Sequence, residues 1–85
     1  MSSKFLLTRL HVVAARGLLQ MNQEQLARAT GVSLSTIKSF ELGSHVPKPE
    51  TVAAVRQALE NRGIEFVNGE EPGVRLRPSK AIVPI

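Results

Sequence analysis

Apolar residues in the first part of the chain recur at the spacing of a helix. From Ser3 to Leu18 they follow steps of three and four, which predicts an amphipathic helix. Ser2 or Ser3 is the expected N-cap, and Gly17 is expected to mark the end of the helix. The predicted core-facing stripe consists of Phe5, Leu6, Leu10, Val13, Ala14 and Gly17.

Two short helices with clear start and stop signals follow. Asn22 is a good N-cap, and a glutamine three residues later completes a capping box. This helix is expected to end at Gly31, where a positive φ is favoured. Ser33 is expected to cap the next helix, over residues 34–42, and a glycine follows that helix as well. The outer face of the helix at 34–42 carries small, polar side chains and almost no charge. A face that only meets solvent usually carries more glutamate and lysine.

The hydrophobic period changes after a fourth helix. Pro49 suits the first position of that helix, and Gly63 is its stop signal. Apolar and polar residues then alternate in 64–67 and 74–77, with turn formers between them, which predicts a β-hairpin. We expect Glu65 to face an arginine of the second strand across the pair.

These elements predict a mainly α fold with a short β extension. Residues 3–62 hold the four helices, residues 63–77 the hairpin, and residues 78–85 a loose tail with two prolines. A chain of 85 residues leaves no room for a second domain of about 100–200 residues.

Composition narrows the function classes. The chain has no cysteine, which excludes disulfides, thiolate metal sites and cysteine nucleophiles. With no tryptophan or tyrosine, a stacking platform for single-stranded nucleic acid would rest on three phenylalanines alone, which argues against that class. No apolar run approaches the roughly 18 residues of a membrane helix, and Arg9 and His11 interrupt the one segment that begins like a secretory signal. We therefore expect a cytoplasmic protein with no membrane partner.

Positive charge is concentrated in the first half of the chain. The net charge is +4, and residues 1–48 hold six basic and two acidic residues, whereas residues 49–85 hold five of each. This asymmetry favours a polyanion-binding face in the first half. Charge that serves only solubility is the alternative.

The segment from Gln23 to Gly43 carries the functional signal. Two helices are joined by a turn at Gly31, with Ala27 where the helices approach closely and Val32 filling the space between them. Such a pair crosses steeply and presents its second helix outward, which suits the major groove of B-DNA, about 12 Å wide. An ordinary αα-hairpin in a small bundle is the alternative.

Nine residues at fixed spacing extend this pattern: Gln23, Leu26, Ala27, Gly31, Val32, Ser33, Ile37, Glu41 and Gly43. Together they resemble the helix-turn-helix of the lambda-repressor/Cro-like family of bacterial and phage regulators, also called the xenobiotic-response-element family. The flanking helices extend the resemblance to roughly residues 4–62. It implies a four-helix lambda-repressor-like DNA-binding domain.

The resemblance also implies roles for individual residues. The helix at 34–42 would be the recognition helix, with Leu34 against a thymine methyl group and serine hydroxyls at base edges. The expected base-reading residues are Leu34, Ser35, Lys38 and Ser39. The residues expected at the DNA backbone are Gln23, Thr36, Ser44, His45 and Lys48.

One departure from strong base readers bears on specificity. The base-reading face has no glutamine, asparagine or arginine, whose bidentate contacts discriminate bases by about 1–3 kcal/mol each. Specificity is then modest, rests on Lys38 and DNA shape, or is lost.

The family resemblance also implies a structural ion pair. In the family, the residues at the positions of Arg16 and Glu41 form a partly buried ion pair. The same pair would join the first helix of this chain to the end of the third. Two independent surface charges are the alternative.

No residue pattern points to catalysis. His11 is expected to be structural or solvated, and Glu70 and Glu71 lie in a turn without a nucleophile or metal partner. The nearby glycines do not form a phosphate-binding loop, because no helix with a Lys-Ser/Thr pair follows them. We expect no enzyme, no metal and no cofactor.

These features predict a sequence-specific regulator that binds double-stranded DNA, as a dimeric repressor. One domain with about four to six phosphate contacts binds weakly at physiological salt, and a two-fold pair gains affinity from half-sites about 34 Å apart. The expected surface for a dimer or another partner consists of Ile64, Phe66, Val74 and Leu76. The alternative function is a protein–protein interaction module, an antiactivator or antitoxin that binds another regulator or a toxin.

Overall fold

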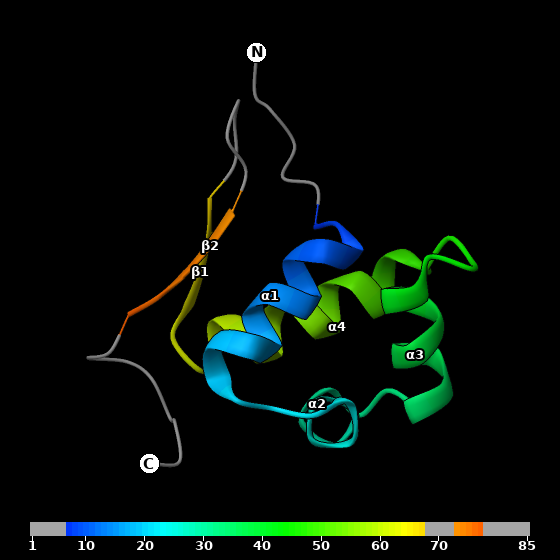
Figure 1. Cartoon of the computed structure of the whole chain (residues 1–85). Helices are drawn as coiled ribbons and strands as arrows, with labels where there is room; N and C mark the ends of the chain where they lie inside the picture. The colour runs from blue at the N-terminus through cyan, green and yellow to red at the C-terminus, as the bar shows by residue number, and fades with distance from the viewer. Residues whose placement is uncertain (1–6, 68–72, 78–85) are drawn as a thin grey trace.

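The computed structural model describes residues 7–67 and 73–77, which form four helices and an antiparallel hairpin (Figure 1). The elements are α1 (Arg9–Leu19), α2 (Gln23–Thr30), α3 (Leu34–Leu42), α4 (Pro49–Glu60), β1 (Ile64–Val67) and β2 (Gly73–Leu76). The predicted mainly α fold with a C-terminal hairpin is confirmed. Outside the described residues lie the caps expected at Ser2 or Ser3, the apolar Phe5 and Leu6, the Glu70–Glu71 pair and the tail at 78–85.

α1 begins later and runs further than predicted. Its N-cap is Thr8, and the His11 side chain closes a capping box: the His11 N–H donates to Thr8 Oγ1 at 3.3 Å, and the Thr8 N–H donates to His11 Nδ1 at 3.1 Å. The helix passes through Gly17 and ends at Leu19, followed by Gln20 in the left-handed conformation with φ 56°. The sequence did not reveal this cap because glutamate or glutamine, not histidine, is the usual partner in a capping box.

α1 also turns a different face to the core than predicted. Its buried residues are His11, Val12, Ala15 and Leu19. Leu10 and Val13, which were expected in the core, are 60% and 39% exposed, and Ala14 and Gly17 are exposed as well. Both faces of the helix are apolar at steps of three and four, so its periodicity alone does not decide which face packs inward.

The predicted boundaries of α2 and α3 and the predicted start of α4 are confirmed, whereas α4 ends at Glu60, before the expected stop at Gly63. Asn22 and Ser33 cap α2 and α3 by accepting hydrogen bonds from backbone N–H groups in the first turn. Gly31 and Gly43 follow these two helices with φ of 74° and 79°, a conformation that a side chain disfavours. α4 begins with Pro49, whose fixed φ suits the first helical position.

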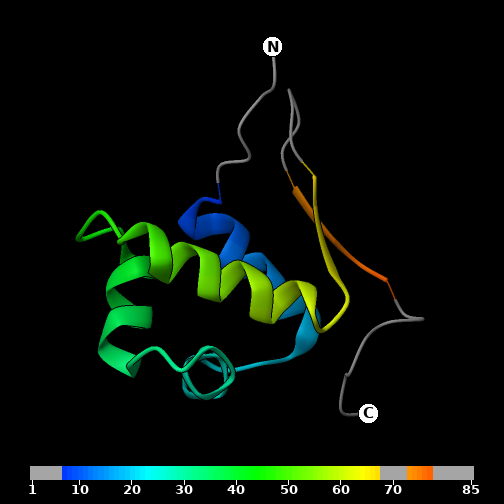
Figure 2. The same cartoon turned by 180° about the vertical axis from the view of Figure 1, so that it is seen from behind.

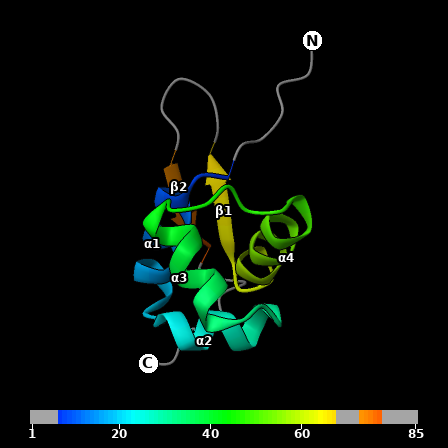
Figure 3. The ribbon, with the colours of Figure 1, turned by 90° about the vertical axis from the view of Figure 1, so that its right-hand side faces the viewer.

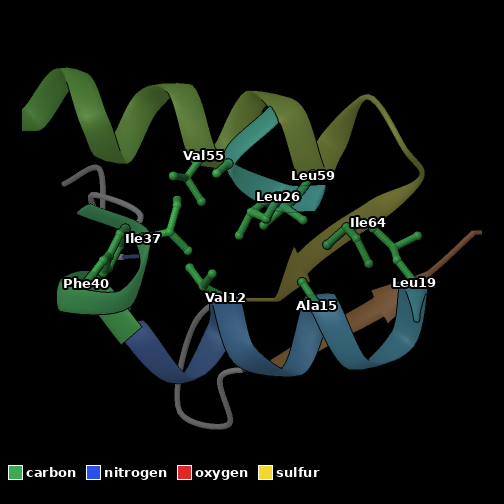
Figure 4. Close-up of a cluster of buried hydrophobic side chains, with 10 residues drawn as sticks. Val12, Ala15, Leu19, Leu26, Ile37, Phe40, Val55, Leu59 and Ile64 are labelled. Carbon is green, nitrogen blue, oxygen red and sulfur yellow. The ribbon is translucent and has the colours of Figure 1, made fainter. Parts of the chain in front are cut away.

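The hydrophobic core lies between α1 and α4. Val12 and Ala15 of α1 point toward Val55 and Leu59 of α4, and Leu26 of α2 lies between the two helices (Figure 4). Seen from behind, α4 runs from the side of α3 toward the hairpin (Figure 2). The core therefore holds α3 at one end of the molecule and the hairpin at the other.

The hairpin turns the apolar face formed by Ile64, Phe66, Val74 and Leu76 toward the helices, so Ile64 of the predicted dimer or partner surface is buried and the other three residues are half-buried. Ile64 pairs with Leu76 and Phe66 with Val74, so the four side chains share one face. Ile64 is 3% exposed and belongs to the core, and the other three pack against it. The physical reason is that an isolated hairpin is marginal in water and must cover its apolar side, and here α1 covers it: the His11 ring meets the Phe66 ring edge-on at 5.9 Å.

The outer face of the hairpin carries the predicted charge pair across the strands. Glu65 accepts hydrogen bonds from Arg75 Nε at 2.7 Å and from Arg77 Nε and Nη2 at 2.8 and 3.0 Å. These bonds, first those from Arg77 and then that from Arg75, lower the pKa of Glu65 to about 2. Glu65 therefore stays charged down to strongly acidic pH.

Candidate nucleic-acid interface

A tight turn sets the relation between α2 and α3. The Gly31 N–H donates to the Ala27 carbonyl at 3.0 Å, which the positive φ of Gly31 allows. The Thr30 hydroxyl donates to the same carbonyl at 3.0 Å and accepts from the Val32 N–H at 3.1 Å. These bonds satisfy the backbone of the turn and hold α3 at the surface, at the front of the view in Figure 3.

α3 has a buried side and an exposed side. Its buried residues are Ile37, Phe40 and Glu41. Ser35 and Lys38 lie on the opposite side and are exposed, and Ser39 beside them is half-buried. A surface helix with small polar side chains has the shape that a major groove accepts.

An open groove of about 310 Å³ runs between α3 and the loop that leads into α4. Its lining includes five of the residues expected to contact DNA: Ser35, Thr36, Ser39, His45 and Lys48. Phe40, Val46, Pro47 and Thr51 complete the lining. Two separate segments of the chain thus contribute hydroxyl, imidazole and ammonium groups to one surface.

The other four residues expected to contact DNA lie outside this groove. Lys38 and Ser44 are exposed, on α3 and in the loop after it. Leu34 packs partly against the core. Gln23 donates from Nε2 to Glu41 Oε1 at 3.0 Å. Part of the Leu34 side chain and one amide hydrogen of Gln23 therefore make contacts within the protein.

A bidentate ion pair connects α1 to α3. Arg16 Nε and Nη2 donate to the two carboxylate oxygens of Glu41 at 2.6 and 2.7 Å, and the side chains are 18% and 6% exposed. Arg16 Nη1 also donates to the Met21 carbonyl at 2.9 Å. The hydrogen bond to Glu41 raises the pKa of Arg16 above its ordinary value. The structure thus contains the ion pair that the family resemblance implies, and the pair braces the helices that support α3.

Lys38 and Lys48 are exposed beside the groove, and neither forms an ion pair within the part of the chain that the structure describes. Arg9, in contrast, is held against the end of α3, where its Nη1 donates to the Glu41 carbonyl at 3.3 Å. Arg16 compensates the Glu41 carboxylate, so Lys38 on α3 and Lys48 in the loop before α4 are exposed without a carboxylate in an ion pair among the described residues. Exposed cations of this kind attract a polyanion.

Two exposed apolar side chains, Leu42 at the end of α3 and Val46 in the lining of the groove, were not predicted from the sequence. Leu42 is 75% exposed and Val46 is 95% exposed. Leu42 follows Lys38 by four residues, so it continues the exposed side of α3, and Val46 is an apolar residue in a polar loop. The spacing of Leu42 and the apolar character of Val46 can both be seen in the sequence. Neither residue is among the helix-turn-helix positions from which the DNA-contacting residues were predicted.

Residues 7–67 and 73–77 show neither a metal site nor a membrane-spanning helix. No group of histidine, aspartate and glutamate side chains in these residues is placed to hold a metal ion. None of the helices described is long and apolar enough to cross a membrane.

The fold and the turn between α2 and α3 define a helix-turn-helix protein. A helix-turn-helix family model of the Cro/CI type matches residues 13–66, more than half of the chain. The chain therefore belongs to the lambda-repressor/Cro-like family of helix-turn-helix proteins, and its domain is that of a DNA-binding regulator. No curated protein matches the chain.

Proposed function

We propose that this protein is a sequence-specific transcriptional regulator that binds double-stranded DNA as a homodimeric repressor. α3 enters the major groove, and the loop between α3 and α4 follows the DNA backbone. The observation that carries the proposal is the groove in which hydroxyls of α3 and the Lys48 ammonium group share one surface. Such a regulator acts in the cytoplasm of a bacterium or of a phage-infected cell.

The residues of this surface divide by the part of DNA they reach. Ser35, Lys38 and Ser39 lie on the exposed side of α3, which faces the base edges once the helix is in the groove. The exposed part of Leu34 meets a thymine methyl group. The residues proposed for the phosphates, where contacts position the protein without reading sequence, are Thr36, Ser44, His45, Lys48 and Gln23.

Gln23 can serve both the protein interior and DNA. Its amide has two hydrogens, and the bond to Glu41 uses one of them. Gln23 is also the first residue of α2, where backbone N–H groups and the helix dipole favour a phosphate.

Base discrimination by this surface is modest. Serine hydroxyls donate to or accept from several base edges, whereas bidentate side chains, at about 1–3 kcal/mol per contact, are absent from the exposed side of α3. Lys38 and the shape of the duplex therefore supply much of the preference. Two domains on a two-fold axis compensate for this by reading two half-sites. A bound dimer represses by excluding other proteins from its site.

Selection from random duplex DNA tests this function. The wild-type chain is expected to bind in a salt-sensitive manner and to enrich a two-fold symmetric motif. The double variant Ser35→Ala/Ser39→Ala is expected to blur the motif, because both base-reading hydroxyls are lost. Ser44→Ala is the matched control, since loss of a backbone contact lowers affinity for all sequences without changing the motif. Absence of salt-sensitive binding by the wild-type chain refutes the proposal.

A protein–protein interaction module is the second candidate. The exposed Leu42 and Val46, beside a recognition helix with weak base readers, favour it. Such a module, an antiactivator or antitoxin, would dock another regulator or a toxin on this side of α3. Leu42→Gln and Val46→Gln would then abolish partner binding, whereas Lys38→Ala and Lys48→Ala would have little effect. DNA binding predicts the reverse order.

A further inference from the structure

The solvent-facing side of α1 is an apolar stripe made of Leu10, Val13, Ala14 and Gly17. Leu10 is 60% and Val13 is 39% exposed, Ala14 and Gly17 are exposed, and no charged residue interrupts the stripe. Leu18, 41% exposed, extends its edge. Apolar residues gathered on one exposed face, unlike ones scattered singly over a surface, are a feature of interaction sites.

The rest of α1 already has partners. Its core-facing side shares the core with residues of α4 (Figure 4) and contacts the second strand of the hairpin. Arg9 and Arg16, on the flank toward α3, bond to the backbone and carboxylate of Glu41. The stripe is therefore the side of α1 that the described residues leave to solvent, and it is apolar although polar residues would serve solubility better.

We propose that this stripe is the surface on which a second copy of the chain docks, with α1 of one copy against α1 of the other. The proposal rests on the proposed function, since it names the dimer element of the DNA-binding regulator. It also replaces the apolar face of the hairpin, which is turned inward.

The chemistry of the stripe suits contact with its own copy. A Cβ built on Gly17 meets nothing within 4 Å, and Ala14 adds only a methyl group, so a second helix can approach closely between Leu10 and Leu18. A two-fold axis brings the same patch of both copies together. Because the stripe is uncharged, this contact brings no like charges into opposition within it.

The direction of the stripe suits a two-fold DNA complex. Figure 3 shows α3 at the front, α1 on one side and α4 on the opposite side. The stripe lies on the side of α1 away from the core, and thus away from α4, so it faces sideways in this view while α3 faces the viewer. A two-fold axis beside α1 and parallel to the viewing direction leaves both copies of α3 on one face, as two half-sites on one side of a duplex require.

The size of the stripe predicts a weak dimer. α1 has 11 residues and is therefore about 16 Å long, so the contact buries much less than the roughly 800 Å² per partner of a standard interface. The free chain should therefore exchange between monomer and dimer. Two adjacent half-sites would raise the effective concentration of the second copy.

Sedimentation equilibrium of the full chain without DNA tests this surface. The variant is Ala14→Gln. The matched control is Ala53→Gln, the same change at an exposed position of α4. The wild-type chain and Ala53→Gln are expected to dimerise reversibly between about 10 µM and 1 mM, the range of interfaces below standard size. Ala14→Gln should dimerise about tenfold more weakly or not at all, because each copy buries an amide without a partner. A monomeric wild-type chain throughout this range, or equal effects of the two substitutions, overturns the proposal.

Cysteine cross-linking provides a second readout, because the chain has no cysteine of its own. Under mild oxidation, Ala14→Cys near the middle of the stripe should form a disulfide-linked dimer much faster than Ala53→Cys. Equal rates place the contact elsewhere. Salt-sensitive binding of the wild-type chain to random duplex is measured in parallel: if it persists while these tests fail, only the α1 surface is refuted, and if it is absent, the proposed function fails.

Discussion

Glu41→Gln is the substitution that tests most severely how α3 is supported. The Glu41 carboxylate lies at the junction of α1, α2 and α3, where it accepts two hydrogen bonds from Arg16 and one from Gln23. Glutamine keeps the shape of the side chain but removes the negative charge. It also replaces one acceptor oxygen by an NH₂ group that faces a guanidinium N–H.

The expected loss follows from burial. Removing one partner of a fully buried ion pair costs about 3–5 kcal/mol, because the other charge stays buried without compensation. Arg16 is 18% exposed and keeps its bond to the Met21 carbonyl, so part of its charge stays hydrated or paired. We therefore expect a loss of about 2–3 kcal/mol. For a chain of 85 residues, whose total stability is about 4–13 kcal/mol, this loss is large.

Urea unfolding followed by circular dichroism measures this loss. With a slope of about 1 kcal/mol per molar urea, the midpoint should fall by about 2 M. Glu60→Gln is the matched control, because Glu60 pairs with Arg56 on the surface of α4, at side-chain exposures of 35% and 44%. An exposed pair four residues apart contributes about 0.3–0.5 kcal/mol. If both variants lose the same small amount, the argument that the Arg16–Glu41 pair braces the motif is refuted.

Three further predictions concern the turn, the hairpin and the interface. Gly31→Ala should lower the free energy of unfolding by about 1–2 kcal/mol, because Gly31 has a left-handed backbone. Gly17→Ala, inside α1 with open space around it, should raise the free energy of unfolding by about 0.5–1 kcal/mol. Thermal unfolding measures both, and effects of the same sign would contradict this prediction. Glu65, with its pKa lowered from 4.5 to about 2, contributes stability that is complete above pH 4.5 and is lost as the pH falls toward 2, so NMR titration of its carboxyl carbon should show a midpoint near 2 and not near 4.5. Lys48→Ala should weaken binding to every duplex and reduce the slope of log affinity against log salt by about one unit; an unchanged slope would place Lys48 away from phosphate.

Local signals predicted the central part of the fold well. Asn22, Ser33 and Pro49 start their helices and Gly31 separates α2 from α3 as predicted, because capping and positive φ depend on neighbours along the chain. The motif also predicted which side of α3 is exposed. What it did not predict is the groove, since that depends on how the loop before α4 folds back toward α3.

The errors concern choices that only packing between distant segments decides. α1 offers two apolar faces, and contacts with the hairpin and with Glu41 determine which one is buried. The same contacts bury Ile64, which the alternation of strand residues could assign equally well to a partner surface. His11, expected to be structural or solvated, is structural: it completes the capping box with the N-cap Thr8, and its ring meets that of Phe66.

The most direct test of DNA binding through α3 is an NMR titration of the isotope-labelled chain with duplex DNA at low salt. The account predicts that backbone amide signals shift in residues 33–39 and 44–48, and that these shifts diminish as salt is added. Signals of the hairpin strands, at 64–67 and 73–76, should stay in place. Shifts centred on the hairpin, or no salt-sensitive shifts in α3 and its following loop, would contradict the account.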